Sequence, residues 1–444
     1  MSGRKMVVVG LAALALLWGS VAGKAQRTRY GIEEWNAFQD TSPQVTQDPQ
    51  QRLQHIETFL SKYPESILRV FVYMYQAQTA FSLQRYELAM EAANSLLAMD
   101  RAEAEDFLRQ SNYNDLQVSN HFYAVHMIYA YSFLQRLSQD PEQVRELMEE
   151  ARERARQGMQ LHEQLYSQVS PPQDPQQRQQ FEQEKKRAEG ALRSVMNPHA
   201  LLANVFWQKK DYEAAAREYE VALAGNPAEP VLNYRLGAAS LQKKPTDYRR
   251  GFWHLARAIG LGINKSDDVR GYLARALAGY QQVPPDCLEG EVNELVARAS
   301  ETVNPPADWE LISAEQVSAV RQRMSVKTIF DELEAGGESA RLMFLAACGT
   351  EIGVGEDGQP GLAVMVLDVT QSEDNLVTLR AAAGQEAVDA KQVNVEVKVV
   401  GPEEAKNLKA EDVVRISGKI SGYQNEPQFL VKLSEGRVHP EDLQ

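Results

Sequence analysis

The feature that most constrains the fold is a repeat of 34 to 36 residues between positions 196 and 259. The pair Leu202-Ala203 recurs 34 residues later as Leu236-Gly237. Two antiparallel helices approach closely only where Ala or Gly lies at their crossing, while large apolar residues fill the space on either side. The repeat therefore predicts stacked helix pairs. Two residues inserted in the turn at 243–246 lengthen the period from 34 to 36 residues for the second helix of the unit. At this longer period, Tyr212, Ala215, Tyr219 and Ala222 recur as Tyr248, Gly251, Leu255 and Ala258.

The same unit carries a recognisable set of residues. The run Asp211-Tyr212-Glu213-Ala214-Ala215, then Tyr219, Ala222 and Asn226-Pro227, follows a first helix that contains Leu202, Ala203 and Phe206. In these residues the unit at 196–229 resembles a tetratricopeptide repeat. Similar units lie at 77–89 and 230–259, and a degenerate one lies at 269–299. The resemblance implies a helical solenoid whose first helices line a concave groove for peptides or protein segments.

Helical periodicity extends over most of residues 49–299. The segment 51–63, for example, places Leu53, Ile56 and Phe59 on one face, whereas 169–180 is rich in Pro, Gln, Ser and Asp and predicts a loop. We therefore assign residues 49–301 to a tetratricopeptide-type helical repeat domain. Asn304-Pro305-Pro306 and Gly336-Gly337 interrupt the helical pattern. Residues 302–345 are accordingly predicted to be a helical connector.

The period becomes strand-like from Gly361 onward. Gly418 lies in the run 412–420, where the chain of a small barrel must bend and pair on both sides, and Gly permits this. A short helix is expected at 402–407, between the third and fourth strands. The order β-β-β-α-β-β resembles an OB-fold, so residues 346–444 are predicted to form a small five-stranded β-barrel. The five Val- and Leu-rich runs are 362–368, 375–380, 393–400, 412–417 and 428–433.

The N-terminus has the order of a secretory signal peptide. Arg4 and Lys5 precede an apolar run of about 13 residues, and small residues follow as far as Ala25. The run is short for a bilayer, which needs about 20 residues. We therefore predict a signal peptide at 1–25, an N-terminal extension at 26–48, and an exported protein, periplasmic or secreted. An uncleaved N-terminal anchor is the alternative.

The two cysteines, Cys287 and Cys348, do not make a disulfide framework. An exported protein could oxidise this pair. The 60 residues between them carry no pairing signature, so the sequence favours two buried or free thiols.

Composition and motifs argue against catalysis and against cofactors. His121 and His126 are five residues apart, so they do not share a helix face as a metal pair would, and no metal site is predicted. The run 353–358 fits G-x-G-x-x-G, but it leads into a strand and contains Glu356 and Asp357, which would repel a pyrophosphate. No nucleophile–base set is visible, so we expect no enzymatic activity, no catalytic residues and no cofactor.

The expected partner is a protein or peptide whose identity the sequence does not give. Trp and Tyr flanked by Asn, Gln and Arg suit recognition of an extended peptide. Ala200 occupies the position where the carboxylate clamp of the family carries Lys, which leaves Asn204 without that partner. Packing of Trp207 on the preceding helix is the alternative to partner binding. The residues predicted on or beside the groove are Asn204, Trp207, Gln208, Tyr234, Arg235 and Gln242.

These observations favour an exported protein-interaction scaffold without catalytic activity. The alternative is an OB-fold ligand binder, for single-stranded nucleic acid or glycan, in which the repeats serve assembly. Nucleic acid is not the expected ligand, because residues 351–444 hold nine Lys or Arg against seventeen Asp or Glu and only two aromatics, Tyr423 and Phe429. The net charge of −14 also argues against binding to anionic membrane surfaces.

Overall fold

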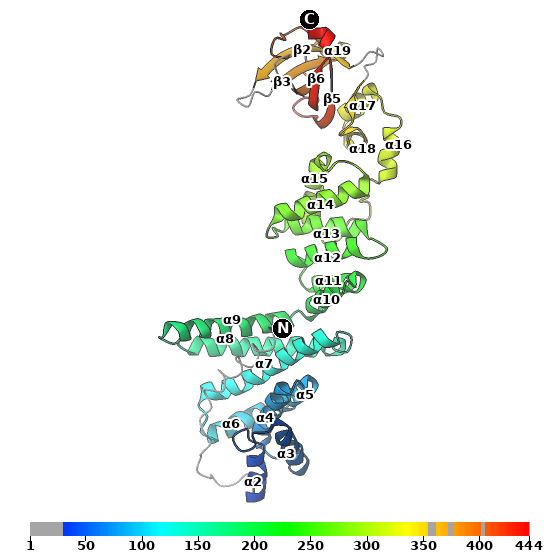
Figure 1. Cartoon of the computed structure of the whole chain (residues 1–444). Helices are drawn as coiled ribbons and strands as arrows, with labels where there is room; N and C mark the ends of the chain where they lie inside the picture. Colours follow the sequence, from blue (N-terminus) through cyan, green and yellow to red (C-terminus); the bar gives the residue numbers. More distant parts are fainter. Residues whose placement is uncertain (1–29, 354–360, 372–376, 401–404, 444) are drawn as a thin grey trace. The chain divides into compact units, whose positions relative to one another are not determined.

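The computed structural model describes residues 30–353, 361–371, 377–400 and 405–443 (Figure 1). The chain forms two compact units, Met1–Gly225 and Asn226–Gln444. The predicted signal peptide at 1–25, the first residues of the extension at 26–48 and most of the G-x-G-x-x-G run lie outside the described residues. Within the described ranges, no helix combines the length and the apolar character that a membrane span requires.

The described part of the first unit, from residue 30 onward, is built from helices alone, and its helix starts follow the sequence. Asp48, Asp174 and Asn197 each accept a backbone N–H at an N-cap, and each is followed by Pro at the first helical position, where its fixed φ is already helical. The elements are α2 (Ile32–Asp40), α3 (Pro49–Lys62), α4 (Arg69–Ser82), α5 (Tyr86–Leu97), α6 (Arg101–Gln110), α7 (Asp115–Gln139), η1 (Arg145–Leu147), α8 (Met148–Gln168), α9 (Pro175–Val195), α10 (Pro198–Gln208) and α11 (Tyr212–Gly225).

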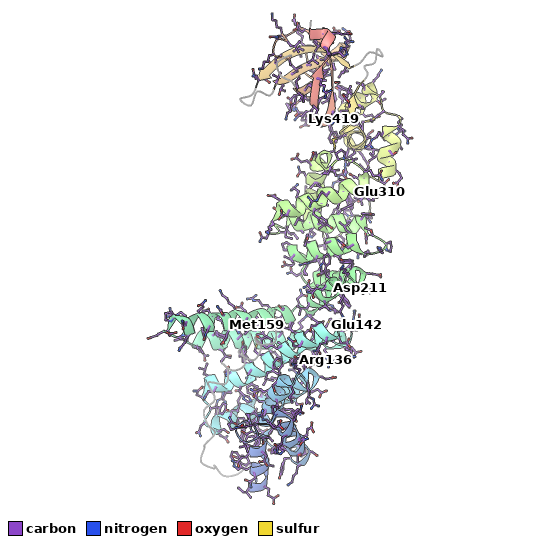
Figure 2. All side chains as sticks on the ribbon, in the orientation of Figure 1. Arg136, Glu142, Met159, Asp211, Glu310 and Lys419 are labelled. Atoms are coloured by element: carbon purple, nitrogen blue, oxygen red, sulfur yellow. A yellow bond between two sulfur atoms is a disulfide. The ribbon has the colours of Figure 1, made fainter. Side chains whose placement is uncertain are left out.

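Helix α7 is the centre of the first unit. It contacts α4 and α5 on one side and α8 and α9 on the other, and it is buried on most of its surface. His121 and His126 of α7 are both buried, and His121 Nε2 lies 3.1 Å from the carbonyl oxygen of Val70. Met159 of α8 is also buried in this packing (Figure 2). The two histidines therefore serve as packing residues.

The second unit begins with two helix pairs of the repeat type. Gly237 of α12 faces Gly251 of α13 so closely that a Cβ on Gly237 would lie 2.9 Å from the Gly251 carbonyl oxygen. This contact explains why the repeat carries Gly where other units carry Ala. Arg257 of α13 donates to the carbonyl oxygens of Ala299 and Thr302 and so caps the end of α15. The elements are α12 (Pro230–Gln242), α13 (Tyr248–Gly260), α14 (Ser266–Gln281), η2 (Pro285–Leu288) and α15 (Glu289–Glu301).

The segment predicted to be a connector contains three helices: α16 (Ala314–Arg321), α17 (Val326–Ala335) and α18 (Gly337–Ala347). Ser313 and Ser325 start the first two with capping boxes. The Trp309 ring packs on Trp253 of α13, with ring centroids 5.0 Å apart. A single apolar core runs from α13 through these helices into the barrel, across the positions 302 and 346 at which domain boundaries were predicted.

The C-terminal part is a closed five-stranded barrel, as predicted. Strands β2 (Leu362–Gln371), β3 (Val377–Ala383), β4 (Val395–Val399), β6 (Leu430–Val438) and β5 (Val413–Gln424) pair in this order, and β5 closes on β2. Among the described strands, only β4 and β6 pair in parallel. At Gly418 the β5–β6 register shifts, and a Cβ there would lie 3.1 Å from the Ser434 carbonyl oxygen. Lys419 beside it forms an ion pair with Glu435, at 2.7 Å.

Short elements around the barrel differ from the expectation. Strand β1 (Glu351–Ile352) extends the sheet beside β5, and helix α19 (Gln385–Asp389) joins β3 to β4. The sequence pattern predicted neither. Of the helix expected at 402–407, residues 402–404 lie outside the described residues; Ala405 is helical, and Lys406 and Asn407 form a turn. A short helical segment, η3 (Pro440–Leu443), ends the described chain.

Candidate functional site

Three of the predicted groove residues lie on α10 of the first unit, and two of them contact α11. Asn204 Oδ1 accepts a hydrogen bond from the Tyr219 hydroxyl at 2.6 Å. The Trp207 ring is half-buried and lies edge-on to Tyr212, with ring centroids 5.1 Å apart. Gln208 is exposed. The Trp207 ring therefore contacts the start of α11, the helix that follows it.

The other three predicted residues lie on α12 of the second unit, and two of them, Tyr234 and Gln242, lie near Tyr272 of α14. Tyr234 and Arg235 are half-buried, and Gln242 is exposed. Burial raises the pKa of Tyr272 on α14, the nearby Tyr234 raises it further, and a hydrogen bond with the Gln242 side chain opposes the shift. Tyr272 thus lies near Tyr234 and Gln242, across two first helices. We call these three residues, with Arg235, the α12–α14 face.

Tyr272 belongs to the α12–α14 face, although sequence reasoning did not select it. It lies on the first helix of the degenerate unit at 269–299, where the repeat signature is weak. A residue next to a buried one, here Leu273, lies about 100° from it around the helix and so at the edge of the apolar face. An aromatic residue at that position is the signal that could have identified Tyr272.

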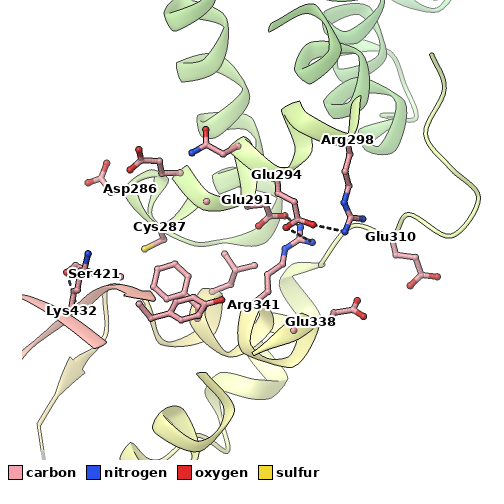
Figure 3. A pocket seen from close by; sticks show the side chains of 18 of the residues that line it. Asp286, Cys287, Glu291, Glu294, Arg298, Glu310, Glu338, Arg341, Ser421 and Lys432 are labelled. Atoms are coloured by element: carbon pink, nitrogen blue, oxygen red, sulfur yellow. Dashed lines mark hydrogen bonds and ion pairs between the residues drawn. The ribbon is translucent and has the colours of Figure 1, made fainter. Parts of the chain in front are cut away.

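A cavity lies within the second unit, between η2, α15, α18 and the β5–β6 hairpin (Figure 3). Its volume is about 950 Å³, near the upper end of the range of about 300–1,000 Å³ for small-molecule sites. We call it the α15–α18 cleft. Asp286 and Glu294 line it from the repeat side, Glu338 and Arg341 from α18, and Lys432 from the barrel. Sequence analysis did not predict this site.

Ion pairs form one wall of the cleft. Arg341 Nη2 lies 2.6 Å from Glu291 Oε1, and Arg341 Nη1 lies 3.8 Å from Glu294 Oε2. Arg298 Nη2 lies 2.7 Å from Glu294 Oε1, which continues the chain of paired charges (Figure 3). The Glu291 side chain is only 4% exposed and also accepts a hydrogen bond from Gln281 Nε2 at 2.9 Å. This wall is therefore anchored by a buried carboxylate.

Two aromatic rings also line the cleft. Phe344 of α18 and Tyr423 of β5 are half-buried, with ring centroids 5.2 Å apart. Burial raises the pKa of Tyr423, with the Arg341 charge opposing the shift and the Glu294 charge adding to it. Tyr423 therefore faces the paired charges described above.

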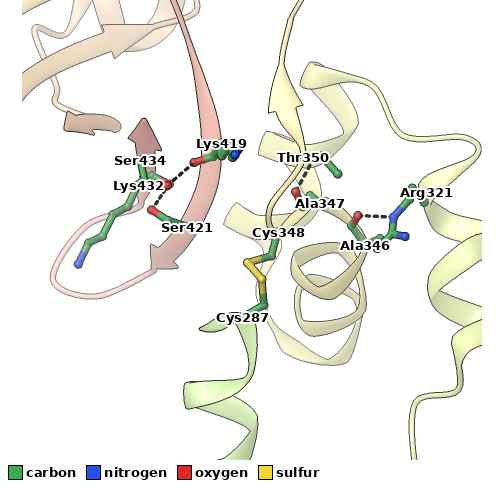
Figure 4. Close-up of a disulfide and its surroundings, with 10 residues drawn as sticks. All are labelled: Cys287, Arg321, Ala346, Ala347, Cys348, Thr350, Lys419, Ser421, Lys432 and Ser434. Carbon is green, nitrogen blue, oxygen red and sulfur yellow. Dashed lines mark hydrogen bonds between the residues drawn. A yellow bond between two sulfur atoms is a disulfide. The ribbon is translucent and has the colours of Figure 1, made fainter. Parts of the chain in front are cut away.

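A disulfide joins Cys287 to Cys348 beside the cleft (Figure 4). Cys287 lies in η2, directly before α15, and Cys348 directly follows α18; each is 4% exposed. The expectation of two buried or free thiols was wrong about the chemical state, although both sulfurs are buried. The chain brings the two Cα atoms within 5.9 Å across 61 residues of sequence, and no local pattern encodes such a contact.

The barrel offers neither of its two aromatic rings for stacking on bases. The Phe429 side chain is buried and contacts Phe330 of α17, with ring centroids 6.0 Å apart. Tyr423 contacts Phe344, as above. Stacking on exposed aromatics is the main sequence-tolerant way to hold single strands. This packing therefore counts against a nucleic-acid groove on the described part of the barrel.

Together, the fold and these surfaces define a class: a helical repeat protein that ends in a small closed β-barrel. The chain matches no protein family in a scan of family profiles, and no curated protein matches it. Among solved structures, it is similar to the crystal structure of the apo form of RapI. The identity is 14%, the match covers 71% of this chain and 96% of that chain, and the TM-score is 0.21.

Proposed function

We propose that this protein is an exported scaffold without catalytic activity that binds a partner protein or an extended peptide through the first helices of its repeats. The observation that carries the proposal is the α12–α14 face, where Tyr272 of α14 lies near Tyr234 and Gln242 of α12, on two successive first helices. Arg235 lies beside them on α12.

The chemistry of this face suits an extended peptide. Tyr side chains have few rotatable bonds, so they contribute contact area at little entropic cost. Gln and Arg add directed hydrogen bonds to the backbone or side chains of a partner. Because α12 packs tightly on α13 through Gly237 and Gly251, the face is held on a rigid helix pair. A pre-organised surface of this kind loses less entropy on binding.

Two features support export. The first is the basic, apolar and small-residue order of the N-terminus. The second is the disulfide between Cys287 and Cys348, because such bonds persist mainly in oxidising compartments. Two measurements would test this part of the proposal. One is whether cells that produce the protein remove its N-terminal segment by proteolysis, and the other is the cell fraction in which the protein is found.

The proposal that the protein is not an enzyme rests on how its titratable groups are used. His121 and His126 are buried in α7, and burial lowers the pKa of each to about 4. His254 is likewise buried, with Nδ1 2.9 Å from Asn233 Oδ1. These histidines are occupied by packing, so they are poorly placed to exchange protons with a substrate.

Partner capture with matched variants tests the scaffold function. Tyr234→Ala together with Tyr272→Ala should abolish capture, because it removes both rings of the face. The control is Tyr248→Ala, on the second helix α13, where a Tyr that is 40% exposed contacts Tyr280. Circular dichroism must show intact folding for each variant.

If the Tyr248 variant loses the partner and the face variant keeps it, binding through the first helices is wrong. If only barrel substitutions release the partner, the alternative of an OB-fold ligand binder gains.

A further inference from the structure

Two buried histidines lie in the α7–α8–α9 layer of the first unit, and the scaffold function does not use them. Helices α8 and α9 form an antiparallel hairpin that packs on α7 (Figure 1). His126 lies on α7 and His162 on α8, and each is 2% exposed. Nδ1 of His126 and Nε2 of His162 are buried and have no hydrogen-bond partner among the described residues. A buried imidazolium has two N–H groups that each need an acceptor, so neither position favours the charged ring.

His126 lies where the three helices come close together. A Cβ on Gly158 of α8 would be 3.0 Å from the Cβ of His126 and 2.9 Å from Cδ2 of Leu192 on α9. The helices therefore pack through a glycine at this level. Because Nδ1 of His126 is itself shielded from solvent, water reaches it when the helices separate.

The charges around His126 also disfavour its protonation. Burial lowers the pKa of His126 to about 4, and the charges of Arg154 on α8 and Arg101 on α6 act in the same direction. A backbone hydrogen bond to Arg154 and the charge of Glu153 oppose the shift. The Glu153 carboxylate is already paired with Arg156, at 2.9 Å. A proton on Nδ1 of His126 would therefore be stabilised poorly while the helices are packed.

His162 is the second neutral histidine of this layer. Its Nδ1 lies 2.9 Å from the hydroxyl oxygen of Tyr123 on α7, and burial lowers the pKa of His162. Glu189 on α9 is already paired with Arg193, at 2.8 Å. The charged groups that act on the ring lie on α8 and α9 and have both signs: Glu163, Lys185, Glu189 and Arg193. Both histidines of the layer thus favour the neutral ring in the closed structure.

The α8–α9 hairpin is held to the unit by few large apolar side chains. Helix α9 buries three residues near its C-terminal end: Ala191, Leu192 and Val195. Three of the seven buried residues of α8 are Ala or Gly. By contrast, ten of the 14 residues of α4 are buried, and three of these are aromatic. The free energy of a local opening rises with the apolar area that it exposes, so the hairpin opens more readily than α4 does.

We propose that the α8–α9 hairpin is a pH-sensitive latch, which protonation of His126 and His162 releases from α7, uncovering the face of α7 that carries His126 and Tyr123. The closed hairpin favours neutral rings, so the latch is shut above the ordinary histidine pKa of about 6.5 and opens as the pH falls toward 4. His121 lies on the α4 side of α7, with Nε2 3.1 Å from the Val70 carbonyl oxygen, and is not part of the latch. The latch lies in the first unit, so it does not depend on the proposed function of the α12–α14 face.

Hydrogen exchange of the full chain at pH 7.5 and pH 4.5 tests the latch, after correction for the intrinsic pH dependence of exchange. An opening that restores the pKa of one histidine from about 4 to about 6.5 has an equilibrium constant that rises about 50- to 100-fold over this range. The opening constant of α8 and α9 should rise by at least this factor. At both pH values the hairpin should also be less protected than α4.

Histidine variants separate the latch from acid unfolding of the whole unit. His126→Gln should reduce the rise in α8 and α9 about 50- to 100-fold and leave α4 as in the wild type, and adding His162→Gln should make the hairpin insensitive to pH. The matched control is His254→Gln, because His254 is a buried histidine of the second unit whose pKa is also lowered to about 4. This control should leave exchange in α8 and α9 unchanged. Circular dichroism at pH 7.5 checks the fold of each variant.

Two results would overturn the latch. If α4 and the hairpin respond to pH and to His126→Gln by the same factor, protonation unfolds the unit as a whole. If protection of α8 and α9 in the wild type is the same at pH 7.5 and pH 4.5, the hairpin does not open in acid. The second result needs no variant, so it decides the matter even if a substitution prevents folding.

Discussion

Removal of the Cys287–Cys348 disulfide should destabilise the second unit and leave the first unit unchanged. The bond closes a loop across 61 residues of sequence. Restricting the unfolded chain by a loop of this length is worth about 4 kcal/mol at 25 °C on the chain-entropy model. Whole domains are stable by only about 5–15 kcal/mol, so this loss is large. For a unit of this size it corresponds to a fall in Tm of about 8–16 °C.

The assay is thermal and urea unfolding of Cys287→Ala/Cys348→Ala beside the wild-type protein with and without a reductant. The reduced wild type is the matched control, because it keeps both buried sulfurs and loses only the covalent bond. The double variant should also lose some packing, since both sulfurs are buried. Thiol titration of the unreduced, denatured wild type should find no free thiol. Two free thiols, or a Tm that the reductant does not change, would refute this reasoning.

Three further predictions follow from packing, charge and the predicted groove. Ala222→Glu should lower the free energy of unfolding by several kcal/mol, because Ala222 is only 5% exposed in α11 and a buried carboxylate would have no partner there. An unchanged melting temperature would show that the repeat register is wrong. The stability of the first unit should fall as the pH drops from about 6.5 toward 4, since burial lowers the pKa of His121 and His126 to about 4. Because the fold favours the neutral imidazole, each histidine stabilises the fold fully above its ordinary pKa, and about 3 kcal/mol of that stabilisation is lost once the pH is below its pKa in the fold. Urea midpoints measured against pH test this expectation. A pH dependence of the midpoint as steep in His126→Gln as in the wild type would contradict it. Trp207→Ala with Arg235→Ala should weaken partner binding by roughly 2–4 kcal/mol, since Trp and Arg are frequent hot spots; isothermal titration against the captured partner measures the loss, and unchanged affinity with an intact circular dichroism spectrum would remove both residues from the binding surface.

The regular parts of the fold could be predicted because their signals are local. Apolar spacing marked the long helices, and the repeated small residues identified the α12–α13 crossing at Gly237 and Gly251. Alternating Val and Leu marked the five barrel strands. Short elements were missed where few residues carry the pattern. Helix α2, for example, is held by Phe38 against Phe59 and Phe71, contacts that come from distant parts of the sequence.

The candidate sites were less predictable, because they are assembled from separate segments. The α15–α18 cleft joins residues from η2, α15, α18 and the β5–β6 hairpin. Glu291 and Arg341 are 50 residues apart, yet they form its central ion pair. Tyr272 escaped notice because its repeat unit is degenerate. Such contacts depend on how helices stack, and the periodicity of a single helix does not contain that information.

The most direct test of the scaffold function is site-specific photo-crosslinking in cells that export the protein. A benzophenone amino acid replaces Tyr234 on the first helix α12, Tyr248 on the second helix α13, or Val413 at an exposed site, 69% exposed, on β5 of the barrel. If the first helices bind the partner, position 234 should give a discrete crosslinked product, and positions 248 and 413 should not. A product at 413 with none at 234 would contradict the account and place recognition on the barrel.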